Sequence, residues 1–153
     1  MAAKKALTGI IMTVWVFVSM VVIPLSTLSM LEKGMTIGGS KIRIEIYGLN
    51  TGLIFFLGFT AMILTAFAYS FRGKSEALFI FLRYVVIAIY EWIWAEGVQK
   101  MKVYTKEGVV YAGVYLGIWI IIVIVGSLLN GTLKALHKYA KAVMEEKKAE
   151  SEG

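Results

Sequence analysis

Residues 49–71 read LNTGLIFFLGFTAMILTAFAYSF, and no charged side chain interrupts them. A helix needs about 20 consecutive apolar residues to cross a hydrocarbon core roughly 30 Å thick, and this stretch reaches that length. It lacks the alternation of apolar and polar residues that a strand of a membrane barrel shows. The stretch therefore predicts a membrane-spanning helix.

Three further blocks of the same kind lie at about residues 6–31, 77–95 and 109–129. The four blocks predict an all-α membrane protein, in which a bundle of four transmembrane helices forms a single domain over residues 1–153. The first block follows Lys4 and Lys5, as in a signal peptide, but it is far longer than the apolar core of such a peptide. We therefore expect a retained anchor helix, kinked at Pro24 because proline removes a backbone donor.

The composition of the whole chain agrees with this class. Of its 153 residues 59% are hydrophobic, the mean hydropathy is +0.76, and there is no cysteine. Soluble globular chains are only about 45–50% apolar, so the composition excludes a soluble enzyme and a disulfide scaffold. The net charge of +6 lies between and beyond the apolar blocks, where lipid headgroups account for it, and no nucleic-acid partner is expected.

The distribution of Lys and Arg predicts the orientation. With a cytoplasmic N-terminus, nine of these residues fall in cytoplasmic segments and six in the two outer loops, at 32–48 and 96–108. Cytoplasmic loops carry the excess of positive charge. We therefore expect a multi-pass protein of the cell membrane with both termini in the cytoplasm.

The outer loops carry strand patterns. Apolar and polar residues alternate strictly over residues 41–47, after the turn sequence Gly38-Gly39, and again over residues 100–105. These patterns predict a small β-hairpin or three-stranded sheet, with its apolar face against the outer end of the bundle.

Residues 130–153 predict an amphipathic C-terminal helix in the cytoplasm, with a bend available at Gly131. Lysines occupy one face. The opposite face would contact lipid or a partner helix through Leu133, Leu136, Val143 and Met144.

Arg83 is the most informative residue, because ionisable groups inside a membrane are costly and mark candidate functional sites. A polar stripe on the third helix would line a cavity or a contact between subunits; its members are Arg83, Tyr84, Tyr90 and Glu91. The alternative for Arg83 is a guanidinium that extends to the headgroups, and for Glu91 an ion pair with a loop lysine.

Other patterns are weaker. Small residues four apart let helices approach closely, and this spacing joins Gly48 to Gly52 and Gly113 to Gly117. Aromatic side chains near the outer boundary suggest an interfacial belt, or alternatively a cage for a cationic solute; they are Trp92, Trp94, Tyr104, Tyr111 and Tyr115. The single histidine, His137, lies among lysines, and we expect no metal and no cofactor.

Three functions are compatible with these features. The first is a non-catalytic membrane protein that acts through assembly, as a self-associating scaffold or a small subunit of a larger membrane complex. The second is an oligomeric channel or transporter for ions or small solutes that uses Arg83 and Glu91. The third, a membrane enzyme, has the least support, because no nucleophile–base pair or catalytic carboxylate pair is visible.

Overall fold

The structure is a computed structural model that describes residues 2–112 and 117–152. Four helical stretches in these residues are long and apolar enough to cross a membrane: Lys4–Lys33, Thr51–Ser70, Lys74–Val98 and Gly117–Ser151. They confirm the four long apolar helices expected from the sequence. A small antiparallel sheet of four strands accompanies them.

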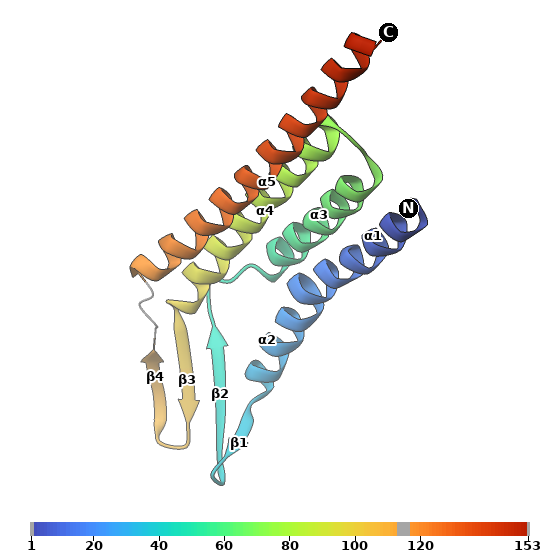
Figure 1. Cartoon of the computed structure of the whole chain (residues 1–153). Coiled ribbons are helices and arrows are strands. Elements are labelled where there is room, and N and C mark those ends of the chain that lie inside the picture. Colours follow the sequence, from blue (N-terminus) through green and yellow to red (C-terminus); the bar gives the residue numbers. More distant parts are fainter. Residues whose placement is uncertain (1, 113–116, 153) are drawn as a thin grey trace.

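Helices and strands occupy opposite ends of the molecule (Figure 1). Both the N and C labels lie at one end of the helices, here called the terminus end, and the strands lie beyond the other, the sheet end. In chain order the elements are α1 (Ala2–Phe17), the π-helical turn η1 (Val18–Val22), α2 (Ile23–Lys33), β1 (Met35–Ile37), β2 (Ser40–Ile46), α3 (Thr51–Ser70), α4 (Lys74–Val98), β3 (Met101–Thr105), β4 (Gly108–Ala112) and α5 (Gly117–Glu152).

The helices form a row rather than a closed bundle. Successive helices pack against each other, α1 on α3, α3 on α4 and α4 on α5, and in their described parts α1 and α5 do not pack together as these pairs do (Figure 1). Residues from all four of these helices line one shared cavity near the terminus end, and this shows that the row is curved. Few of the apolar side chains along the row are consequently buried, and most are at least partly exposed.

Pro24 explains an irregularity in the first membrane-length helix. Because proline has no N–H, it cannot donate to the carbonyl of Met20 four residues earlier, and the chain forms the wide turn η1 just before it. The Tyr90 hydroxyl of α4 donates to that Met20 carbonyl at 2.7 Å. A side chain seventy residues away therefore satisfies the acceptor that the proline leaves open.

We predict that Tyr90→Phe lowers the free energy of unfolding by about 1–2 kcal/mol, because it leaves the Met20 carbonyl without a donor. Pro24→Ala supplies a backbone N–H for the same carbonyl. The cost of Tyr90→Phe should therefore shrink in the Pro24→Ala background, which denaturant titration of all four proteins in detergent would measure. Equal costs in the two backgrounds would show that the contribution of this hydrogen bond does not depend on Pro24.

The sheet contains one strand more than expected. Its order is β1-β2-β3-β4 with all neighbours antiparallel, so it is a meander. The block at 109–129 was interpreted as one helix, and this was wrong: residues 108–112 form β4, and α5 begins at Gly117. The two-residue loop Lys106-Glu107 reverses the chain between β3 and β4, and the β-branched and aromatic residues that follow favour a strand.

The register separates the sheet into an apolar and a polar face. Residues directly opposite one another point to the same side, and one cross-strand row consists of Ile44, Val103 and Val110. None of the residues on this face is buried. The apolar face comprises Met35, Ile37, Ile42, Ile44, Ile46, Met101, Val103, Val110 and Ala112, together with Ser40, Thr105 and Gly108 at the turns.

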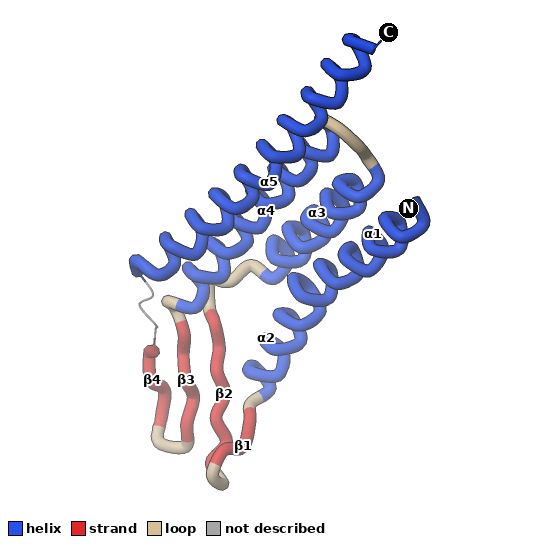
Figure 2. The backbone as a smooth tube through the Cα atoms, viewed as in Figure 1, coloured by secondary structure: helices blue, strands red, loops and turns tan. Residues whose placement is uncertain are grey.

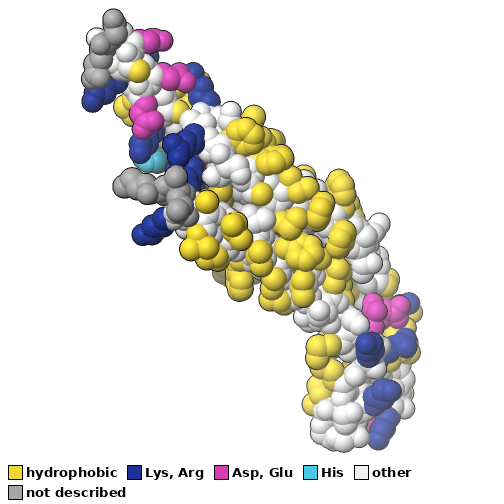
Figure 3. All heavy atoms as spheres, turned by 90° about the vertical axis from the view of Figure 1, so that its right-hand side faces the viewer, with side chains coloured by type: hydrophobic (Ala, Val, Ile, Leu, Met, Phe, Trp, Pro, Cys, Tyr) yellow, Lys and Arg dark blue, Asp and Glu magenta, His cyan; other side chains and the backbone are white. Residues whose placement is uncertain are grey.

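The polar face holds a network of its own. The Tyr104 hydroxyl donates to Glu45 at 2.7 Å, and the Arg43 guanidinium lies 4.4 Å from the centre of the Tyr104 ring. The ammonium group of Lys102 lies 4.6 Å from the Tyr47 ring centre. Figure 3 shows the same division, with hydrophobic side chains on one side of the sheet and Lys and Arg on the other.

The sheet does not fold over the helices. The strands continue beyond the helix ends (Figure 2), but sheet and helices stay in contact: Ile46 on the apolar face packs against Gly97 near the end of α4, and α2 packs against β2. The expectation that the apolar face rests on the outer end of the bundle stays a prediction, which these contacts support only at the edge of the sheet nearest the helices. The residues of that face are partly or fully exposed, and none of them is buried.

The last helix runs without interruption from Gly117 to Glu152, so the chain does not bend at Gly131. Gly131 instead faces Tyr84, where a Cβ atom would overlap the tyrosine side chain. Ala135 and Ala142 on the same side of α5 are also buried. These small residues let α5 lie close to α4.

Candidate functional site

The structure places a cavity of about 590 Å³ near the terminus end of the row, here called the basic cavity. All four membrane-length helices contribute side chains to it. Its polar and charged lining is Tyr69, Glu76, Arg83, Tyr84, Lys134, His137 and Lys138, and its apolar lining is Met12, Ala68, Ile80 and Leu133. A volume of this size is typical of small-molecule sites.

Tyr84 is the centre of the cationic part of this cavity. The Lys134 ammonium donates to the Tyr84 hydroxyl at 2.9 Å and lies 5.4 Å from the ring centre. The Arg83 guanidinium lies 5.0 Å from the same ring centre. The Nε atom of Arg83 is buried and has no hydrogen-bond partner among the described residues. Two cations thus flank one neutral ring.

The carboxylate of Glu76 is already engaged. It pairs with Lys138 of α5 at 2.9 Å and with Lys5 of α1 at 3.4 Å, and its side chain is only 13% exposed. No described carboxylate pairs with Arg83 or Lys134. The basic cavity therefore carries positive charge that the protein itself does not neutralise.

The predicted polar stripe is divided between two places. Arg83 and Tyr84 line the basic cavity, whereas Tyr90 and Glu91 line a different cavity of about 380 Å³ between α4 and α5. Tyr90 also bonds to η1, as described above. The four side chains therefore share a helix but do not share one cavity.

The second cavity is mostly apolar around Glu91. One carboxyl oxygen of Glu91 accepts from the Ser127 hydroxyl of α5 at 3.1 Å, and the other is buried with no partner in the described residues. The indole N–H of Trp94 in the same cavity is likewise buried and unpaired there. Glu91 does not pair with a loop lysine, and the loop pair that forms is Lys100 with Glu96 at 3.2 Å.

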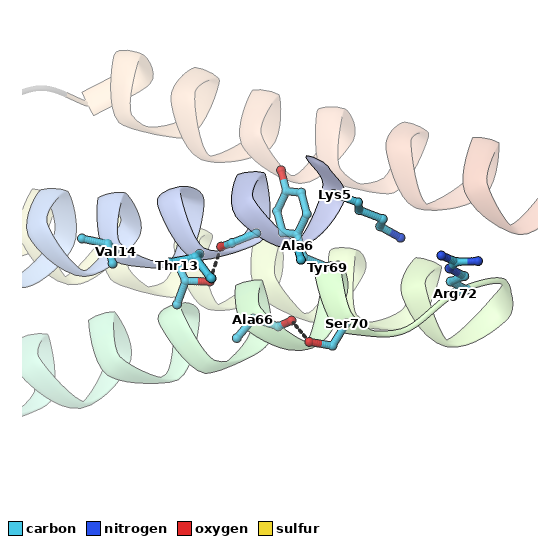
Figure 4. Close-up of a pocket in the computed structure, with 10 residues that line it drawn as sticks. Lys5, Ala6, Thr13, Val14, Ala66, Tyr69, Ser70 and Arg72 are labelled. Carbon is cyan, nitrogen blue, oxygen red and sulfur yellow. Dashed lines mark hydrogen bonds between the residues drawn. The ribbon is translucent and has the colours of Figure 1, made fainter. Parts of the chain in front are cut away.

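A third cavity, of about 490 Å³, lies between α1 and α3 (Figure 4). Two of its hydroxyl groups are occupied by their own helices: Thr13 donates to the carbonyl of Gly9 at 2.7 Å and Ser70 to that of Ala66 at 2.8 Å. Lys5 and Arg72 lie together at one end of it in Figure 4. The cavity offers a ligand these two cations and the side chain of Tyr69.

The structure does not place the predicted pair Gly48 and Gly52 in a helix crossing, and the pair Gly113 and Gly117 lies partly outside the described residues. Gly48 precedes α3 with a φ of 88°, and a Cβ atom on Gly52 would meet only the side chain of Asn50. Gly113 lies outside the described residues, and Gly117 is the first residue of α5. The close approach between α4 and α5 is made by Gly131 instead.

The predicted contact stripe of the tail is largely exposed. Leu133, Leu136 and Met144 are each more than half exposed, and Val143 is partly covered. The face of α5 that packs on α4 is the one with Gly131, described above. The apolar stripe therefore stays a prediction for contact with lipid or a partner.

The aromatic residues near the sheet end do not form one group. Trp92 is 56% exposed, Trp94 lines the second cavity, and Tyr104 and Tyr111 belong to the polar face of the sheet. Tyr115 lies outside the described residues. Within residues 2–112 and 117–152 no three His, Cys, Asp or Glu side chains come together as metal ligands would.

Sequence reasoning singled out Arg83 and Tyr84 but missed the lysines that join them. Lys134 and Lys138 were assigned to the polar face of a cytoplasmic tail, and the structure brings both to the basic cavity. The signal was present in the spacing, because Lys134 and Lys138 are four residues apart and therefore lie on one side of a helix that continues from the apolar block. No protein-family model, curated protein or solved structure matches the chain.

Proposed function

We propose that this chain is a non-catalytic, multi-pass membrane protein that acts by self-association, and that two copies pack the apolar faces of their sheets together. Both termini lie in the cytoplasm in this proposal, which follows from the excess of Lys and Arg at the terminus end. The observation that carries it is the apolar face of the sheet, in which no residue is buried and which continues beyond the helix ends (Figure 2).

The sheet and the helices differ in what covers their apolar surface. Lipid tails are as apolar as leucine side chains, so exposed apolar residues along the helices need no protein partner. A sheet beyond the helix ends faces water, where an apolar face is costly. A second sheet packed about 10 Å away would bury it. Only the apolar face requires this cover, because the opposite face has its own charged network.

The size of the face explains why the membrane matters for this contact. Four strands about 4.8 Å apart and five residues of about 3.4 Å each give roughly 330 Å² per copy, well below the 1,200 Å² or more in total that stable interfaces bury. Copies anchored side by side in one membrane meet at a raised effective concentration. Association should therefore depend on anchoring as well as on the sheet.

Single-cysteine variants test this contact directly, because the chain has no native cysteine. Val103 and Lys102 are neighbours on the central strand β3 and point to opposite faces. In lipid nanodiscs or native membranes, a short bis-maleimide should join two copies of Val103→Cys and should not join Lys102→Cys. Cross-linking that is equal for the two variants, or absent from both, would contradict the proposed dimer.

A charge variant provides the complementary control. Val110→Glu places a carboxylate on the apolar face, and Val109→Glu places one on the polar face of the same edge strand; the two valines are 57% and 49% exposed. We expect native mass spectrometry to show monomers for Val110→Glu and dimers for Val109→Glu. Both variants should fold, since neither side chain is buried.

The channel or transporter remains the alternative proposal. It is favoured by the buried, unpaired atoms of Arg83 and Glu91. Because these two residues line different cavities, a conducting path would have to form between subunits. This alternative would be favoured over the dimer if the protein forms a closed ring of more than two copies. Its conductance should then change in the Arg83→Ala and Glu91→Ala variants.

A further inference from the structure

We propose that the basic cavity binds an anionic phosphate group between Arg83 and Lys134, with the Tyr84 hydroxyl beside it. This site is independent of the sheet contact proposed above. It lies at the other end of the molecule and uses α4 and α5 rather than the strands.

The unneutralised charge points to an anion. Arg83 and Lys134 flank the Tyr84 ring at 5.0 and 5.4 Å from its centre, and neither has a described carboxylate partner. Arg83 is nine residues from the start of α4, which corresponds to about 14 Å along the helix. Two cations held together at that depth are costly without a counter-charge. An anion in the cavity would supply it.

The donors favour phosphate among anions. A guanidinium presents a planar fork of N–H groups that suits phosphate oxygens, and a lysine ammonium adds a point charge. The Lys134 ammonium retains donors beyond the one used by Tyr84, because an ammonium group has three. Glu76, which an anion would avoid, is held by Lys5 and Lys138.

The cavity also suits a phosphate that carries an apolar group. Met12, Ile80 and Leu133 line it beside the cations, and its volume of about 590 Å³ exceeds what a bare phosphate fills. The headgroup of an anionic phospholipid has this combination, and free inorganic phosphate shares only the charged part. Both sources present a phosphate group to the cavity, and the experiment below distinguishes between them.

The experiment uses the delipidated full chain in an uncharged detergent. It is titrated with a short-chain phosphatidylglycerol, with the matching phosphatidylcholine, and with inorganic phosphate, and binding is followed by ³¹P NMR and by the shift in thermal unfolding. We expect phosphatidylglycerol to bind, and Lys134→Gln and Arg83→Gln each to weaken that binding about tenfold or more. Lys134→Arg keeps the charge and should keep most of the affinity.

Lys147→Gln is the matched control, because it removes the same charge from α5 thirteen residues beyond Lys134 and outside the cavity lining. It should change the affinity less than twofold. Saturable binding of inorganic phosphate that Lys134→Gln abolishes would assign the free anion as the ligand and uphold the site. Equal losses for Lys134→Gln and Lys147→Gln would overturn it, and so would a lack of preference for phosphatidylglycerol over phosphatidylcholine together with no binding of inorganic phosphate.

Discussion

Replacing Gly131 by alanine should separate α4 from α5 and lower the free energy of unfolding by about 3 kcal/mol. A Cβ atom at this position would overlap the Cβ and Cγ atoms of Tyr84, which belong to the root of a side chain and move only with the backbone of α4. Added methyl groups in a tight contact typically cost about 1–3 kcal/mol, and this contact is at the upper end. The loss should also disturb the hydrogen bond between Lys134 and Tyr84.

Gly126→Ala is the matched control for this experiment. Gly126 lies on the same helix, and a Cβ atom there would meet nothing within 4 Å. Alanine favours a helix over glycine by about 1 kcal/mol, so this variant should be as stable as the parent or more stable. Thermal unfolding of both variants in detergent separates the two effects. A Gly131→Ala protein as stable as Gly126→Ala would show that α4 and α5 do not pack as described.

Replacing Glu76 by glutamine should lower the free energy of unfolding by about 2 kcal/mol, because it weakens the contacts between helices at the terminus end. Glu76 is the single described carboxylate that links α4 to both α1, through Lys5, and α5, through Lys138. Its removal leaves two lysines facing each other without a counter-charge. Breaking a buried pair costs about 3–5 kcal/mol and a surface pair at most about 1 kcal/mol. The intermediate value follows because Glu76 is 13% exposed but its partners are 33% and 45% exposed.

Glu146→Gln is the control for Glu76→Gln. Glu146 pairs with Lys74 at 2.6 Å, but both side chains are about half exposed, so solvent screens the pair. Denaturant titration should show a change below about 1 kcal/mol for Glu146→Gln. Salt should weaken the surface pair more than the shielded one. Similar losses for the two variants would mean that Glu76 does not link the helices.

The long helices could be predicted from the sequence because the property that indicates them, a continuous run of apolar residues, is local. An apolar block of membrane length can be read without knowledge of its neighbours. The boundary at β4 failed for the same reason: Val109 to Ala112 are apolar like the helix that follows, and continuous apolar residues do not distinguish a strand from a helix. Residues 108–112 form a strand because they pair with β3, and hydropathy carries no information about such pairing.

The candidate site could be predicted only in part. Arg83 stands out because it is the one basic residue in an apolar block. Lys134 can bond to Tyr84 because of the position of α5 along the axis of α4. That position depends on the close contact between Gly131 and Tyr84. A single glycine in a helical segment predicts either a bend or a close contact, and the choice between them requires the partner helix.

The bond from Tyr90 to Met20 has a consequence for how the helices are aligned along their axes. Apolar helix faces in hydrocarbon change little in energy when one helix slides past another by a single residue, about 1.5 Å. A hydrogen bond does not tolerate such a slide, and the proline leaves one carbonyl open at one height on the first helix. The defect that Pro24 introduces thereby fixes the vertical position of α4, and with it the height at which Arg83 lies.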